Sequence, residues 1–139
     1  MKRQRRSLWK SISTSIKVNA LSAPAVILYT FGIAHLDDEG YMDGDPRILK
    51  SQVVPLRDDI PASIVPQLTE EIATIHEKLG IEIPLWVIHR IPPLIIIQDP
   101  ASPKRQSFKG VHKIPSDLAQ IVDKAKQISF LPSRKASVG

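Results

Sequence analysis

Cysteine is absent from the chain, which excludes disulfide bonds, thiolate metal sites and thiol nucleophiles. Long apolar runs are also missing. The most apolar segment, residues 25–34, is interrupted by Thr30 and Gly32 and is much shorter than the roughly 20 residues that a membrane span requires. We therefore expect no membrane among the partners of this protein.

The sequence motifs of common enzyme sites are missing as well. There is no phosphate-binding loop, no nucleophile elbow and no His-Glu-x-x-His pair of metal ligands. The four histidines fall in separate segments without the spacing of a metal site. In the acidic stretch 37–45, Tyr41 stands where a calcium-binding loop needs an acid. We predict that the protein is not an enzyme and uses no metal or cofactor.

Charge is distributed unevenly along the chain. The first 36 residues contain six basic residues and no acid, residues 37–99 contain five basic and twelve acidic residues, and residues 100–139 contain eight basic and two acidic residues. An acidic middle between basic ends is typical of proteins that bind a polyanion, most often nucleic acid. Solvated tails are an alternative. The basic, hydroxyl-rich start would also suit an organellar leader or a structural protein of an organelle or ribosome.

Capping residues followed by proline predict the first two main helices. Ser22 precedes a proline and an apolar run, so we expect its hydroxyl to accept an N–H of a helix that ends near Leu36. This run is apolar on nearly every face, which predicts a central helix. Asp45 and Pro46 repeat the signal and predict a second helix through Val53.

Residues 35–49 join these two helices. We interpret Gly40 and Gly44 as turn residues, and Tyr41 and Met42 as a stub of strand. The acids are interpreted as turn and cap residues, Asp45 in particular.

A third helix is predicted over residues 62–79. Its apolar stripe at helical spacing consists of Val65, Leu68, Ile72, Ile75 and Leu79. Gly80 is a natural stop, and Pro66 is tolerated only in the first turn. Residues 85–90 and 94–98 then predict two strands around the three-residue break 91–93.

A last helix is predicted over residues 117–128, with an apolar stripe that packs on the core or on a partner. This order of elements predicts an α+β fold of the winged-helix type, with a three-helix helix-turn-helix core, a two-stranded β-hairpin wing and an extra C-terminal helix. The expected divisions are a basic N-terminal arm at 1–17, a winged-helix domain at 18–99 and a basic C-terminal extension at 100–139.

Several motifs follow one another in a fixed order. They are Leu-Ser at 21–22, Asp-Asp-Glu-Gly-x-x-x-Gly-Asp-Pro at 37–46, Val-x-Pro-x-x-Asp-Asp-Ile at 53–60, Leu-Gly-Ile at 79–81 and Pro-Ser at 115–116. In this order they resemble the N-terminal winged-helix domain of phage and prophage replication proteins, the DnaD-like replisome organisers and their short relatives. The resemblance covers residues 8–116.

That resemblance implies a role in DNA replication or in the control of phage genes, in the cytoplasm of a bacterial host. It also implies that the N-terminal segment is retained, because the similarity begins upstream of Lys17. The chain departs from the family at the tip of the wing, where Pro92 and Pro93 occupy the place of the usual glycine turn.

In a helix-turn-helix protein, one helix enters the major groove, and here the third helix would do so. Its outward face is predicted to carry Ser63, Gln67, Glu70, Glu71, Thr74 and Lys78. Gln67 suits adenine and Thr74 suits a phosphate or a thymine methyl group, whereas the two glutamates would repel phosphates. The alternative is that this helix only packs or contacts protein, so that the domain forms a homo-oligomer or docks on a replication protein.

Phosphate contacts are expected from basic residues around that helix and in both ends of the chain. They are Lys2, Arg3, Arg5, Arg6, Lys10, Arg47, Lys50, Arg90, Lys104, Arg105, Lys109 and Lys113. Such contacts give an affinity that falls steeply with salt and carry little sequence information. The expected partner is double-stranded DNA. Trp9 beside the N-terminal arm either stacks on a base or anchors the arm to the core.

Overall fold

The structure is a computed structural model that describes residues 10–100 and 117–130. It confirms an α+β fold. In chain order the described elements are η1 (Lys10–Thr14, a 3₁₀ helix), α1 (Ile16–Asn19), α2 (Ala23–Ile33), β1 (Tyr41–Asp43), α3 (Pro46–Gln52), η2 (Ala62–Ile64, a 3₁₀ helix), α4 (Val65–Lys78), β2 (Val87–Ile91), β3 (Leu94–Gln98) and α5 (Asp117–Phe130). The helical turns η1 and α1 lie where the sequence predicts an arm leading into the domain.

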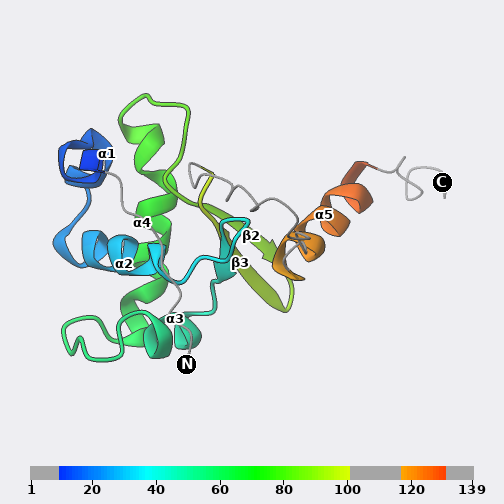
Figure 1. The fold of residues 1–139 in the computed structure, drawn as a ribbon, viewed down its shortest axis with the longest axis horizontal. Helices are drawn as coiled ribbons and strands as arrows, with labels where there is room; N and C mark the ends of the chain where they lie inside the picture. Colours follow the sequence, from blue (N-terminus) through cyan, green and yellow to red (C-terminus); the bar gives the residue numbers. More distant parts are fainter. Residues whose placement is uncertain (1–9, 101–116, 131–139) are drawn as a thin grey trace, which may run out of the picture.

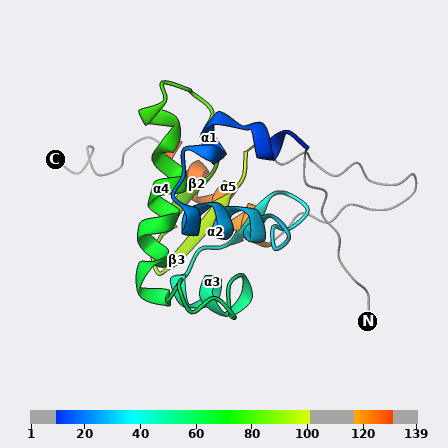
Figure 2. The ribbon, with the colours of Figure 1, turned by 90° about the vertical axis from the view of Figure 1, so that its left-hand side faces the viewer.

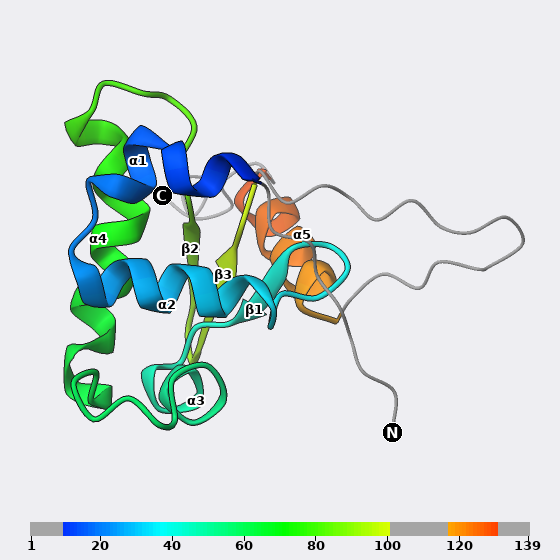
Figure 3. The same cartoon turned by 60° about the vertical axis from the view of Figure 1, so that its left-hand side comes forward.

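These elements form three layers around a small sheet (Figure 1). Helices α2 and α4 cover one face of the sheet, and α5 lies on the opposite face. Seen from the helical side, α2 crosses the sheet while α4 runs along one side of it (Figure 2). Helix α3 lies at one end, below α2 (Figure 3). The sheet therefore separates a larger core from a smaller one.

The larger core is built around Trp86, whose side chain is 0% exposed. The ring of Tyr29 on α2 lies 5.6 Å from that of Trp86, centroid to centroid. The predicted central position of α2 is confirmed for one side of the helix, where Leu28 and Ala25 are completely buried. Phe31 on the other side is 47% exposed, so α2 is not buried on every face.

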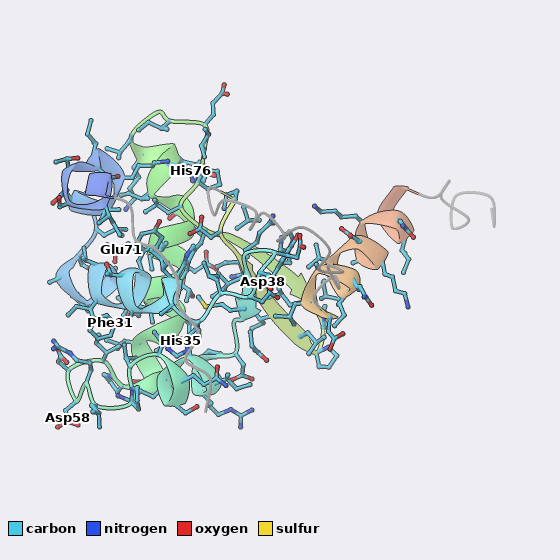
Figure 4. The ribbon with its side chains drawn as sticks, viewed as in Figure 1. Phe31, His35, Asp38, Asp58, Glu71 and His76 are labelled. Atoms are coloured by element: carbon cyan, nitrogen blue, oxygen red, sulfur yellow. The ribbon has the colours of Figure 1, made fainter. Side chains whose placement is uncertain are left out.

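The start of α2 is held by a residue of another helix. Ser22 occupies the N-cap position, but its side chain accepts no N–H of the first turn. Instead, the Ser22 hydroxyl donates to Glu71 Oε1 at 2.8 Å, and the Ser22 N–H donates to Glu71 Oε2 at 2.5 Å. The predicted serine cap is therefore wrong in detail. A carboxylate of α4 is the acceptor at this end, and it ties α2 to α4 (Figure 4).

Within residues 35–49, acidic side chains bind backbone N–H groups in the turns before and after β1. Asp37 Oδ1 accepts from the N–H groups of Glu39 and Tyr41, at 2.9 and 3.0 Å. Asp43 Oδ1 accepts from the N–H of Asp45 at 2.9 Å. The interpretation of these acids as turn residues agrees with this geometry.

The two glycines of this turn have different roles. Gly40 has a φ of 87°, a left-handed conformation that favours glycine, as a turn residue requires. Gly44 instead lies against β3, where its N–H donates to the carbonyl oxygen of Ile95 at 2.8 Å. A Cβ at Gly44 would lie 2.9 Å from Ile95 Cγ2 and 3.0 Å from Ile97 Cγ1. Gly44 therefore permits a close approach between the end of β1 and β3.

Helix α3 begins as predicted. Asp45 Oδ1 accepts from the N–H of Arg47 at 2.9 Å, and Pro46 lies in the first turn, where its missing N–H costs no helical hydrogen bond. Leu49 and the C-cap residue Val53 are buried in the core.

Helix α4 starts later than predicted, at Val65 rather than residue 62, because a 3₁₀ turn precedes it. Pro66 therefore falls in the first turn, the one position where the sequence allows it. The helix ends before Gly80, which has a φ of 67° and donates its N–H to the carbonyl oxygen of Glu77.

The sheet has three strands, not the two predicted for the wing. The strand order is β1-β3-β2, and both pairings are antiparallel. The stub predicted between the first two helices pairs with β3 and becomes an edge strand. The hairpin is also tighter than predicted, because Ile91 pairs with Leu94 and only Pro92 and Pro93 form the loop. The first strand of the hairpin begins at Val87, two residues later than predicted.

Helix α5 covers the second face of the sheet, so the predicted C-terminal helix is present. Ala119 and Val122 are buried against Tyr41 and Ile96. Ile128 belongs to the same apolar stripe but is 70% exposed, because the end of α5 projects beyond the sheet (Figure 1).

Candidate nucleic-acid interface

The outward side of α4 is the surface that the helix-turn-helix hypothesis assigns to DNA. Ser63, Gln67, Glu70 and Lys78 are exposed, and Thr74 is half-buried. Steps of three and four positions between them place these residues on one side of the helix and of the 3₁₀ turn before it. The opposite side carries the predicted apolar stripe and is buried in the core, apart from Leu79 at its end.

Glu71 does not belong to this surface, contrary to the prediction. Its carboxylate is bound by Ser22 at the start of α2, and Figure 4 shows it between the two helices. Glu77, which the predicted face omitted, has a 73% exposed side chain and lies close to Glu70 in helical projection. The outward side therefore still carries two carboxylates, but one of them differs from the prediction.

Glu70 forms an ion pair with Arg90 of β2. The side chains of the two residues are 48% and 58% exposed, respectively. Both residues were predicted to contact DNA separately, Glu70 from the helix and Arg90 through a phosphate. The structure brings them together, so the charge that would repel a phosphate is offset by a guanidinium beside it.

Thr74 and Gln67 offer different chemistry on the same side. The Thr74 hydroxyl donates to the carbonyl oxygen of Glu70 at 2.8 Å, so its proton is used inside the helix. Its methyl group keeps the ability to contact a thymine methyl. Gln67 is exposed about two turns before Thr74, with an amide that suits the paired donor and acceptor of adenine.

Arg47 and Lys50 on α3 behave differently from one another. The Arg47 side chain is 88% exposed and lies 3.6 Å from Asp45, from Nε to Oδ1, so it points outward as expected. Lys50 does not point outward. Its Nζ donates to the carbonyl oxygens of Val54 and Arg57, at 3.0 and 2.6 Å, and so holds the segment that follows α3.

Most of the remaining predicted phosphate contacts lie outside the described residues. These are the side chains of Lys2, Arg3, Arg5, Arg6, Lys10, Lys104, Arg105, Lys109 and Lys113. Trp9 lies outside them as well.

Several large apolar side chains are exposed, Phe31 and Leu56 among them. Phe31 on α2 is 47% exposed, and Leu56 in the loop after α3 is 91% exposed. Figure 4 shows Phe31 on the side of α2 toward the loop that carries Asp58. For Leu56, the sequence indicates exposure only through its position directly after a proline, where the chain leaves helix α3.

The titratable groups with a clear shift lie away from this side of α4. The pKa of Tyr41 is raised, chiefly by burial and then by the negative charges of Asp123, Asp37 and Glu39. The pKa of Asp45 is lowered, chiefly because its carboxylate accepts the Arg47 N–H.

Within residues 10–100 and 117–130, no three His, Asp or Glu side chains are grouped closely enough to hold a metal ion. None of the helices in the same part of the chain is both long enough and apolar enough to cross a membrane.

Comparison of the chain with protein-family models, with curated proteins and with solved structures gives no significant match. The resemblance to phage replication proteins therefore rests on the sequence motifs and stays a prediction.

Proposed function

We propose that this protein is a winged-helix protein that binds duplex DNA, with α4 as the helix presented to the major groove. The observation that carries the proposal is the order α2-β1-α3-α4-β2-β3, with β3 between β1 and β2 in the sheet. A helix-turn-helix followed by a hairpin has this order. In this arrangement the apolar side of α4 is buried, while its outward side is exposed for contact.

The charges of the surface also support duplex binding. Arg90 offsets Glu70 on the outward side of α4, and Arg47 is exposed at the start of α3. The ends of the chain add many basic residues to a protein with a net charge of +5. Together these residues favour contacts to phosphates, which supply affinity with little sequence selectivity.

The motif resemblance extends the proposal to a biological role. We place the protein in the replication initiation or gene control of a phage or mobile element, acting in the cytoplasm of a bacterial host. This part of the proposal depends on the ordered motifs at 37–46 and 53–60. The structure gives these motifs structural roles, since the first forms the turn into α3 and the second includes the Arg57–Asp59 ion pair.

Titration of a labelled duplex by fluorescence anisotropy tests duplex binding. We expect binding at about 50 mM salt that weakens by at least tenfold at about 200 mM salt, as for several phosphate contacts. Gln67→Ala is expected to reduce the preference between duplexes of different sequence, whereas Arg47→Ala is expected to weaken binding to all of them equally. Absence of binding at the lower salt concentration would refute the proposal.

A protein-interaction module is the second candidate function. It is favoured by the two carboxylates on the outward side of α4 and by the exposed side chains of Phe31 and Leu56. Light scattering of the wild type and of Glu70→Lys and Glu77→Lys tests whether α4 mediates self-association. An oligomer that persists in both variants does not use this side of α4. Glu71 is unsuitable for this test because it holds the start of α2.

A further inference from the structure

The Glu70–Arg90 pair links the outward side of α4 to the wing. Glu70 lies on α4 and Arg90 lies on β2, one residue before the strand ends at the hairpin loop. Both side chains are about half exposed, so the pair lies at the surface between the two elements. In a winged helix these are the two elements that face a duplex, the helix in the groove and the wing beside it.

Arg90 reaches α4 because of the strand alternation in β2. Ile88, two positions earlier, packs against the larger core on the helical face of the sheet, and side chains two apart share a face. Arg90 therefore extends toward α4, where Glu70 contacts its Nη2. A guanidinium carries five N–H donors in a planar fork, so a contact to one nitrogen leaves donors for a second anion.

We propose that Glu70 is a positioning residue, which holds the Arg90 guanidinium so that it binds a DNA phosphate at the edge of the groove entered by α4. This inference rests on the proposed duplex binding. It gives the Glu70 carboxylate a favourable role in that binding, in addition to its repulsion of DNA phosphates. An arginine on an exposed strand loses side-chain entropy when it binds a phosphate. Because Glu70 already restrains Arg90 in the unbound protein, less of that entropy is lost on binding.

A positioning role and simple charge repulsion predict opposite changes in DNA affinity when Glu70 is neutralised. If Glu70 only repelled phosphates, neutralising it would tighten DNA binding. If it positions Arg90, neutralising it weakens binding, because the loss of a restrained phosphate contact outweighs the smaller repulsion. The two roles can therefore be separated by measuring one substitution.

Glu77→Gln is the matched control for Glu70→Gln. Glu77 lies on the same side of α4, its side chain is 73% exposed, and its Oε1 lies 4.0 Å from Nε2 of the adjacent His76. Both substitutions remove one negative charge from the same surface. Only Glu70→Gln removes a contact to Arg90.

The experiment measures duplex affinity of the full chain at two salt concentrations for the wild type, Glu70→Gln, Glu77→Gln, Arg90→Ala and the double variant Glu70→Gln/Arg90→Ala. We expect Glu77→Gln to tighten binding and Glu70→Gln to weaken it by roughly two- to fivefold, the range available to an exposed ion pair. Arg90→Ala should weaken binding and reduce the slope of log affinity against log salt by about 0.9, which is one phosphate contact.

The double variant provides the strongest check. Once Arg90 is absent, Glu70 can act only through its charge, so Glu70→Gln in the Arg90→Ala background should tighten binding as Glu77→Gln does. A Glu70→Gln variant that tightens binding in both backgrounds would overturn the inference while leaving duplex binding intact. If the wild type does not bind duplex DNA at low salt, both the inference and the proposed function fail. Thermal unfolding of each variant verifies that the comparison is between folded proteins.

Discussion

Individual residues in the 35–49 segment show how this sequence determines its own turn. The carboxylates of Asp37 and Asp43 accept backbone N–H groups within the turn, so these acids replace hydrogen bonds that a short loop cannot make with itself. Gly40 supplies the left-handed conformation, and Gly44 supplies space. The role of Gly44 can be tested by a single substitution, and so can that of Asp45, the N-cap residue of α3 that follows it.

Gly44→Ala is expected to lower the free energy of unfolding by about 1–3 kcal/mol, because the new methyl group must displace packed atoms. Its Cβ would meet Ile95 Cγ2 at 2.9 Å and the Ile95 carbonyl oxygen at 3.2 Å. Urea unfolding monitored by tryptophan fluorescence measures the change. Gly80→Asn is the control, since a Cβ at Gly80 would meet no atom within 4 Å and asparagine tolerates its left-handed φ. A Gly44→Ala variant as stable as the control would contradict the packing role.

Asp45 gives the stability of the protein a defined dependence on pH. Its pKa is lowered in the folded state, chiefly by the hydrogen bond from the Arg47 N–H. A carboxylate with a lowered folded pKa contributes stability above its unfolded pKa, and this contribution is lost as the pH falls through the folded pKa. We expect Asp45→Asn to keep the helix cap but to show a smaller loss of stability than the wild type between about pH 5 and about pH 2.

Urea unfolding of both proteins across this range measures the difference. The pKa of Asp59 is also lowered, chiefly by the hydrogen bond from the Arg57 side chain, so some acid sensitivity is expected to persist in Asp45→Asn. Identical pH profiles for the two proteins would show that Asp45 does not cap α3 in solution.

At the level of helices and strands, contacts between distant segments hold the molecule together. Glu71 joins α4 to the start of α2 across 49 positions of the chain. We expect Glu71→Ala to lower the free energy of unfolding by about 1–2 kcal/mol, because two donors of Ser22 lose their acceptor. Glu77→Ala, an exposed carboxylate on the same helix, should change it by less than about 0.5 kcal/mol. Chemical denaturation provides both values, and equal effects would argue against the link between α2 and α4.

Docking of α5 on the outer face of the sheet is tested by a second pair of variants. Val122 is 1% exposed, and its truncation to alanine should cost about 1.5–3 kcal/mol through lost apolar burial and the cavity that remains. Ile128 is 70% exposed, so Ile128→Ala should have almost no effect. If the two substitutions prove equally mild, α5 does not pack on Tyr41 and Ile96 in solution.

Caps, prolines and apolar periodicity predicted most helices and strands. They did not predict the contacts between segments that are far apart in the sequence. The cap residue Asp45 and Pro46 act on neighbouring N–H groups, so the sequence alone located the start of α3, whereas α4 starts at Val65 and not at the predicted residue 62. The pairing of β1 with β3 and the capture of Ser22 by Glu71 join segments far apart. Such pairs depend on how the helices pack, which periodicity along one segment does not specify.

The outward side of α4 was likewise predicted only where helical spacing alone decides which residues are exposed. Helical spacing correctly placed Gln67, Glu70, Thr74 and Lys78 on the exposed side of α4. It misplaced Glu71, because the position of α2 decides which residues at the edge of the face are covered. The inward role of Lys50 was equally hidden, since its partners are carbonyl oxygens of the following loop.

At the scale of the whole molecule, the packing of the helices on the sheet decides which surfaces are buried and which stay exposed. Helix α5 and the core side of α4 cover the two faces of the sheet, and the outward side of α4 and the end of the hairpin stay exposed. The proposed function uses this second surface. The apolar side chains of Phe31 and Leu56 belong to another part of the molecule and provide an internal negative control for contact mapping.

Mapping of backbone amide chemical shifts during titration with a short duplex at low salt tests whether α4 enters the DNA groove. We expect the changes to concentrate on the outward side of α4, at Gln67, Glu70, Thr74 and Lys78, and on Arg90 at the end of β2. They should disappear at high salt, as counterions replace the phosphate contacts. Changes confined to the region of Phe31 and Leu56 or to α5, or no changes at low salt, would contradict the assignment of α4 to the DNA groove.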